Sequence, residues 1–217
     1  MFVDMVPVTD VFTTNSYFYI DETTRHGFLI DPGAEPNRLK QIIKDKNYVI
    51  EKILLTHGLF DHTGGVEVLA RELSVSYYIH ENGEKFLEDV HYNLSIHCNR
   101  RVVLNNAKYL KDGDTITLEA NPNAKLDVIH TPGHTPDSVV FYDKNNGIAF
   151  VGDTIFKGAI GNSEYPGGNG QELSESIINR IFTLPSETVS ITGARKAAPT
   201  PIVPTIERPA SMPLAES

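Results

Sequence analysis

Residues 56–65 constrain this chain most, because they place two imidazoles and a carboxylate within a few positions directly after the apolar run at 53–55. A short apolar run bounded by glycine is typical of a buried strand. A loop that leaves such a strand can aim several side chains at one point from a rigid base. We therefore predict that His57, Asp61 and His62 gather at the end of a strand.

Two further polar residues stand in the same context downstream. His134 lies in the run Thr-Pro-Gly-His-Thr-Pro at 131–136 and Asp153 follows the apolar residues 148–151. A divalent metal ion needs convergent imidazole and carboxylate donors at about 2.0–2.2 Å, with open positions for water or substrate. The candidate metal ligands are therefore His57, Asp61, His62, His134 and Asp153.

Length and composition exclude several classes of protein. The chain has 217 residues, of which 40% are hydrophobic and 22% charged, as expected for one globular domain, which we place at 1–193. No apolar run approaches the roughly 18 residues of a membrane span. A net charge of −9 disfavours nucleic acid as a partner. The lone Cys98 and an N-terminus without the pattern of a secretory signal favour a cytoplasmic location. Nothing indicates the oligomeric state.

Hydrophobic periodicity predicts two halves, each built of strands and helices. We expect an antiparallel meander over 2–8, 16–20 and 28–30, and helices over 35–46, 66–73 and 84–89. The further predicted elements are strands at 50–55, 75–79, 115–118, 125–129, 138–142, 148–151 and 188–192, and a helix at 173–182. Residues 91–104 lack periodicity and are interpreted as a mobile cover over a pocket. The proline-rich residues 194–217 are predicted to be a disordered tail.

Several of these motifs resemble, in the same order, the signature loops of the metallo-β-lactamase fold superfamily, particularly its glyoxalase II-like (hydroxyacylglutathione hydrolase-like) thioester hydrolases. They lie at 15–17, 30–33, 56–65, 131–136, 152–156 and 158–168, and the resemblance covers about 15–192. It implies an α+β fold, a four-layer αββα sandwich, with a metal pair at one edge.

The resemblance also implies roles for the candidate ligands. His57 and His134 would serve the first metal, Asp61 and His62 the second, and Asp153 would bridge the two. Asp61 would in addition orient the attacking water and so take part in catalysis. The implied reaction is hydrolysis of a small thioester or ester with one or two Zn²⁺ ions, and Fe²⁺ is a possible alternative metal.

Three positions depart from the family pattern. Leu59 stands where the pattern His-x-His-x-Asp-His calls for a histidine, Ala194 stands where a ligand of the second metal is usual, and Asp137 replaces a glycine. The loss of one imidazole from each position predicts weaker metal binding, with a single ion or a partly filled pair, and impaired activity. The composition after Gly193 suggests a hypothesis that the reading frame changes there.

Two alternative functions stay open at this stage. His57, His134 and Asp153 alone are two imidazoles and one carboxylate, a set suited to non-haem iron and similar to that of the persulfide dioxygenases of the same superfamily. The other alternative is a degenerate member that folds but binds metal too weakly for catalysis. His130, four residues before His134, is interpreted as a hydrogen-bonding neighbour of the ligands and not as a ligand.

Overall fold

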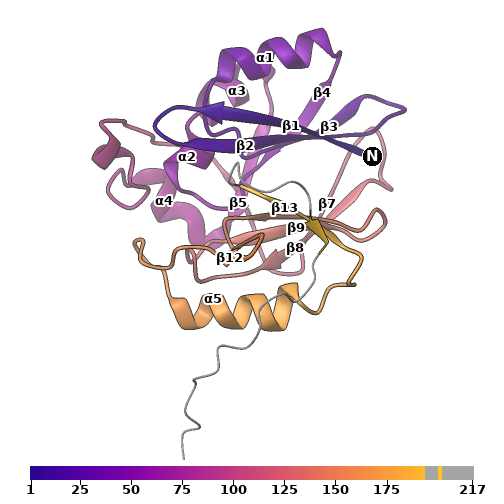
Figure 1. Ribbon diagram of the computed structural model, residues 1–217. Helices are drawn as coiled ribbons and strands as arrows, with labels where there is room; N and C mark the ends of the chain where they lie inside the picture. Colours follow the sequence, from indigo (N-terminus) through magenta and orange to yellow (C-terminus); the bar gives the residue numbers. More distant parts are fainter. Residues whose placement is uncertain (194–199, 202–217) are drawn as a thin grey trace, which may run out of the picture.

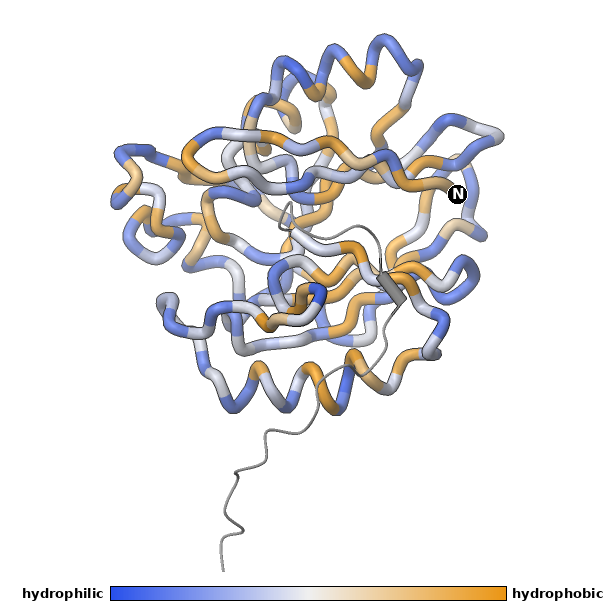
Figure 2. Tube along the Cα trace, in the orientation of Figure 1, coloured by the Kyte–Doolittle hydropathy of each residue, from blue (hydrophilic) through white to orange (hydrophobic). Residues whose placement is uncertain are grey.

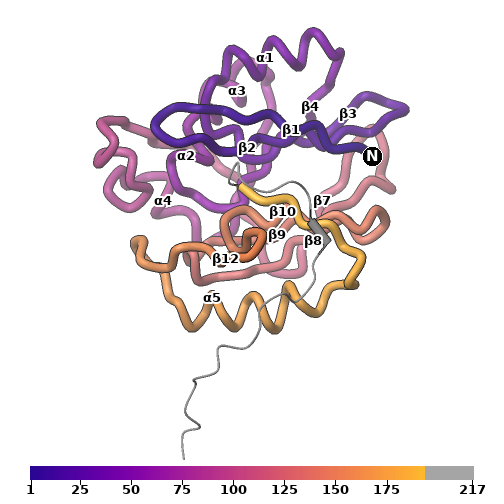
Figure 3. The backbone as a smooth tube through the Cα atoms, viewed as in Figure 1, coloured from indigo at the N-terminus to yellow at the C-terminus, as the bar shows by residue number. Residues whose placement is uncertain are grey.

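The computed structural model describes residues 1–193 and 200–201, which form two facing β-sheets with helices on both outer faces (Figure 1). Figure 3 shows that the first half of the chain builds one sheet and the second half builds the other. The predicted four-layer αββα sandwich is thereby confirmed.

The first sheet begins as an antiparallel meander and continues with parallel strands. Its order is β1 (Phe2–Thr9), β2 (Thr13–Ile20), β3 (His26–Ile30), β4 (Val49–Leu54), β5 (Ser76–His80) and β6 (Lys108–Leu110). The parallel steps from β3 to β4 and from β4 to β5 run through α1 (Pro36–Asp45) and α3 (Val66–Leu73). Parallel neighbours require such crossovers. The loop with His57, Asp61 and His62 leaves the end of β4 and begins the crossover to β5.

The second sheet is mostly antiparallel. Its order is β14 (Thr200–Pro201), β13 (Val189–Thr192), β10 (Ile148–Gly152), β9 (Val139–Asp143), β8 (Lys125–His130) and β7 (Thr115–Thr117). The tight connection between β9 and β10 turns at Gly147, where φ is 62°. The parallel step from β10 to β13 passes through α5 (Gly170–Ser176) and a π-helical turn, Ile177–Ile181.

Successive side chains of a buried strand point to opposite faces of its sheet, so each sheet packs on both faces. In β10, Phe150 joins the cluster between the two sheets, whereas Ala149 and Val151 pack against α5. The outer face of the first sheet packs in the same way against α1 and α3, through residues such as Leu39 and Leu69. Hydrophobic and hydrophilic residues accordingly alternate along the outer helices in Figure 2.

Several short elements were not predicted. The ligand loop contains α2 (Phe60–Thr63), and further along lie η1 (Glu81–Gly83), η2 (Ser95–Cys98), β6 and the small hairpin of β11 (Ile155–Phe156) and β12 (Ala159–Ile160). These segments are too short to show a period. The predicted helix at 84–89 is α4 (Glu84–Glu88). The predicted helix at 173–182 begins earlier, because the Asn169 side chain accepts bonds from two backbone N–H groups of its first turn.

Most of the predicted tail falls outside the described residues. The exception is Thr200–Pro201, which pairs antiparallel with Val189 and Ser190 of β13. The predicted cover at 91–104 contains η2 and has Asn93 and Ser95 buried. Within the described part of the chain, no helix has the length and apolar character to cross a membrane.

Candidate metal centre

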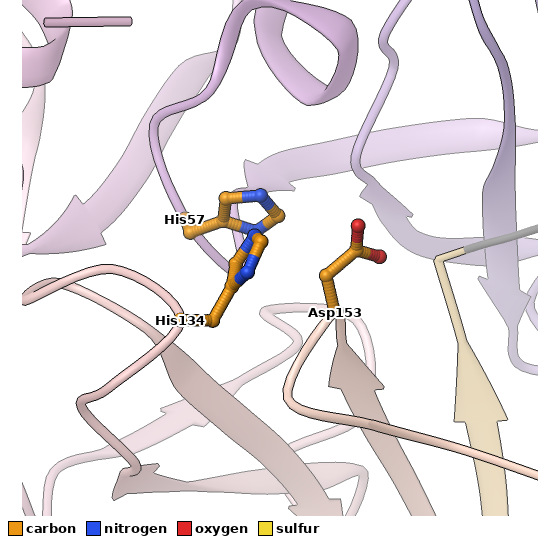
Figure 4. A group of neighbouring side chains, drawn as sticks. All are labelled: His57, His134 and Asp153. Atoms are coloured by element: carbon orange, nitrogen blue, oxygen red, sulfur yellow. The ribbon is translucent and has the colours of Figure 1, made fainter. Parts of the chain in front are cut away.

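Three strand ends meet at one edge of the sandwich and bring three candidate ligands together (Figure 4). His57 follows β4, His134 follows β8 and Asp153 follows β10. One ligand atom from each of these residues lies within 4.8 Å of the other two. No other group of three or more ligand-type side chains in the described residues comes this close. The spacing suits a single ion between them.

His62 and Asp61 lie beside this group, on α2. The ring centroids of His57 and His62 are 4.1 Å apart, and those of His57 and His134 are 4.8 Å apart. His62 Nε2 lies 3.6 Å from Asp153 Oδ1 and 3.8 Å from Asp61 Oδ2. All five predicted residues therefore lie in one cluster, and their role as metal ligands stays a prediction.

Hydrogen bonds fix the same tautomer in all three imidazoles. His134 Nδ1 donates to the carbonyl of Asn162 at 2.6 Å, and His62 Nδ1 donates to the Asp31 carboxylate at 3.0 Å. The Thr56 hydroxyl gives its proton to Asp31, so it accepts from His57 Nδ1 at 3.1 Å. Because a neutral imidazole carries one proton, His57 and His134 keep the lone pair of Nε2 free, and His62 does so whenever its ring is neutral.

Unpaired buried donor atoms are the main sign that the site fits a metal. The Nε2 atoms of His57, His62 and His134, together with Asp153 Oδ1, are buried and have no hydrogen-bond partner among the described residues. Buried polar atoms are normally paired, so four orphaned atoms in one cluster call for an occupant. A divalent cation suits this donor set, since imidazole nitrogens and a carboxylate are its usual ligands.

The protonation of these residues depends on where each lies in the cluster. Burial, with the neighbouring imidazoles, holds the pKa of His57 well below 6.5, and burial also lowers the pKa of His134. Both rings are therefore neutral and able to ligate at neutral pH. Although burial opposes its charged form, the carboxylates of Asp153, Asp61 and Asp31 raise the pKa of His62 well above 6.5. Without a cation, this imidazole offsets the negative charge of its neighbours.

Asp31 supports the centre from behind. Its carboxylate accepts from the Thr56 N–H at 2.8 Å, from the Thr56 hydroxyl at 2.6 Å and from His62 Nδ1. It thus orients His62 directly and His57 through Thr56, as carboxylates commonly do behind metal-bound histidines. We did not predict this role. The signal was present, since Asp31 is a strand-end carboxylate in one of the motifs at 30–33.

Gly193 closes the centre on the side of β13. A methyl group at this position would lie 2.2 Å from Asp153 Oδ1 and 2.6 Å from His62 Cε1, so only glycine fits without displacing a candidate ligand. Leu59 is 4% exposed yet belongs to none of the three hydrophobic clusters of the described residues. Ala194, the other departure from the family pattern, lies outside the described residues.

Asp137 and His130 lie near the His134 loop but outside the cluster. Both carboxylate oxygens of Asp137 are buried and have no hydrogen-bond partner among the residues that the structure describes, and burial raises the pKa of this group to about 6. His130 Nε2 donates to the carbonyl of Pro136 at 2.8 Å, and its ring stacks on His80. In the described residues His130 makes no hydrogen bond to a candidate ligand, so its bond supports the backbone of the loop.

Sequence comparisons identify the family. The profile of the metallo-beta-lactamase superfamily matches residues 9–193. The probable metallo-hydrolase YqgX of Bacillus subtilis is 34% identical over 180 residues, covering 82% of this chain and 83% of the relative. Hydroxyacylglutathione hydrolase GloC of Haemophilus influenzae is 30% identical over 199 residues, covering 89% and 90%. This chain belongs to the metallo-β-lactamase superfamily.

Solved structures agree with this assignment. The BLEG-1 B3 metallo-beta-lactamase superposes with a TM-score of 0.85 at 29% identity, over 92% of this chain and 94% of that one. TTHA1623 in a di-iron-bound form gives 0.78 at 29% identity, over 90% and 94%. The superfamily typically binds zinc or iron. Together with the named relatives, this supports a metallo-hydrolase as the class of this chain.

Proposed function

We propose that this chain is a metal-dependent hydrolase of a small thioester or ester, with one divalent ion held by His57, His134 and Asp153. The observation that carries the proposal is the convergence of buried, unpaired donor atoms from these residues. A bound ion of this kind supplies an acidified water and a polarised substrate carbonyl at neutral pH. Zn²⁺ is the ion we expect, in one copy or as a partly filled pair.

The chain's own groups prepare the site for this chemistry. Thr56 and the Asn162 carbonyl hold His57 and His134 in the ligating tautomer before any ion arrives. Asp61 has a side chain about one-fifth exposed and lies beside the cluster, where its carboxylate can accept a hydrogen bond from the attacking water and orient it. With Asp61, His62 and the shared Asp153, a second ion would have three donors, and we propose that it binds more weakly.

The name of one relative supports the kind of bond that we propose is cleaved. GloC of Haemophilus influenzae carries in its name a hydroxyacyl-glutathione substrate, which is a thioester. A thioester carbonyl is more electrophilic than an amide and has a good leaving group, so a site with few ligands is still adequate for it. A small hydroxyacyl thioester is therefore the substrate class that we propose.

The test is hydrolysis of a hydroxyacyl-glutathione by zinc-loaded protein, followed through the released thiol. Loss of activity after chelation and in His134→Ala is expected, whereas His97→Ala should leave the rate unchanged because that side chain is exposed and outside the cluster. Zinc-loaded protein that releases no thiol, or hydrolysis that survives both chelation and His134→Ala, would refute the proposal.

One observation favours a second candidate. The group of mutually close ligands consists of two imidazoles and one carboxylate, the set that suits a mononuclear iron enzyme acting with oxygen. Oxygen uptake by iron-loaded protein with glutathione persulfide would support a dioxygenase, and its absence with active zinc-loaded protein would exclude it. A chain that retains neither metal would correspond to the non-catalytic alternative.

A further inference from the structure

A cleft of about 340 Å³ lies beside α2, separate from the metal-centre cluster. Four segments form it: the end of β1 with Thr9 and Asp10, the turn at 33–36 before α1, α2 itself, and residues 100–102. Phe60 and Gly64 of the ligand loop line the cleft, whereas Asp61 and His62 between them belong to the metal centre. The cleft is therefore a different site, built in part from the same short helix.

The charges around the cleft are paired, with one exception. Asp10 receives two hydrogen bonds from Arg100, at 2.6 and 2.8 Å, in a bidentate pair. Glu35 accepts from Arg38 at 2.8 Å and from the Thr9 N–H at 3.1 Å. Arg101 lines the cleft as well, and it makes no hydrogen bond, ion pair or ring contact with any described residue. Within the part of the chain that the structure describes, the cleft thus presents one unpaired guanidinium, on an exposed side chain.

The rest of the lining combines apolar side chains with polar groups and backbone. Pro36 and Val102 are half-buried and present apolar surface to the cleft, whereas Phe60 and Ala34 are only 4% and 9% exposed. The volume is at the lower end of the range of small-molecule sites. A guanidinium offers a planar fork of donors that matches a carboxylate, and the apolar walls favour a hydrocarbon body next to it.

From the guanidinium that is unpaired among the described residues, the paired acids and the apolar part of the wall, we propose that this cleft binds a small organic carboxylate, with the carboxylate on Arg101 and the hydrocarbon part against Pro36 and Val102. This site does not depend on the metal chemistry proposed above, since none of the five candidate ligands lines it. The cleft borders Phe60, the residue directly before Asp61, whose backbone N–H donates to the Asn93 carbonyl at 3.1 Å.

The test is titration of the full-length protein with benzoate, followed by calorimetry and by NMR shifts of backbone amides. We expect shifts at Phe60, Gly64 and Val102, and affinity at least tenfold weaker in Arg101→Gln. Arg71→Gln is the matched control, because Arg71 is an exposed arginine of α3 outside the cleft. Inorganic phosphate should bind at least tenfold more weakly than benzoate, since it lacks a hydrocarbon part.

Three results would overturn the proposal. The first is equal benzoate affinity in the unsubstituted protein and in Arg101→Gln. The second is phosphate affinity as high as that for benzoate, which would indicate a site for any anion. The third is a set of shifts confined to the loops of His57, His134 and Asp153, which would place the carboxylate at the metal centre. None of these results depends on whether the protein hydrolyses a thioester.

Discussion

Asp137 is a buried carboxylate whose replacement by asparagine should make the protein less sensitive to pH. It is fully buried, and neither of its oxygens has a hydrogen-bond partner in residues 1–193 or 200–201. Gly58 and Gly83 leave space for its side chain. Burial raises the pKa of Asp137 from 3.8 to about 6, because the ionised form loses its hydration. The native state therefore favours the protonated acid.

The sign and the size of the effect follow from this shift. A folded pKa above the unfolded one contributes stability that is complete below pH 3.8 and is lost as the pH rises through about 6. Since one pKa unit corresponds to 1.36 kcal/mol, the full loss is about 3 kcal/mol. By the same linkage relation, a little under half of this stability, about 1.3 kcal/mol, is lost as the pH rises from 5 to 7.5.

Urea unfolding of chelator-treated protein at pH 5 and pH 7.5 measures this contribution. The free energy of unfolding of Asp137→Asn should rise relative to that of the unsubstituted chain by about 1.3 kcal/mol between these two pH values. Comparing the two proteins cancels the titration of the histidines that they share. Asp45→Asn, at the exposed end of α1, is the control and should show no such trend. A difference between Asp137→Asn and the unsubstituted chain that stays constant with pH would refute the reasoning.

Three other predictions concern the metal centre. Asp31→Asn replaces one of two acceptor oxygens by an NH2 donor and removes the negative charge, so the three bonds that orient His62 and Thr56 cannot all form. Metal affinity measured by competition with a chelating dye should fall ten- to a hundredfold with the fold retained. Unchanged affinity would contradict the role of Asp31. Gly193→Ala should weaken metal binding at least tenfold, because its methyl group would displace Asp153, whereas Gly170→Ala, which meets only Ser163 Oγ at 3.2 Å, should not. Leu59→His combined with Ala194→His should raise both metal content and the rate of thioester hydrolysis, and no gain would show that the missing imidazoles are not what limits the protein.

The parts of the fold that could be predicted from the sequence have a clear period or a clear chemical pattern. The helix at 66–73 and the strands that carry His57 and His134 show this, because alternation and apolar runs encode which face is buried. The clustering of the five candidate ligands was also predictable, since loops at the ends of neighbouring strands open at one edge of a sandwich. For this reason the ligand loops could be grouped before the structure was known.

Other features depend on contacts that sequence patterns do not encode. α2 is four residues long and has no period to detect, and β6 has two of its three residues exposed. The burial of Asp137 depends on the absence of side chains at Gly58 and Gly83, which are distant from it in sequence. The close approach of Gly193 to Asp153 likewise arises only when β13 pairs with β10. Such long-range packing has no local signal.

The metal content of purified protein tests the central claim most directly. After loading with zinc and removal of excess metal, the chain should retain about one ion, and both His57→Ala and His134→Ala should retain almost none. His97→Ala should retain as much as the unsubstituted protein. Full zinc retention in His57→Ala and His134→Ala would contradict the claim that these two imidazoles and Asp153 hold the ion.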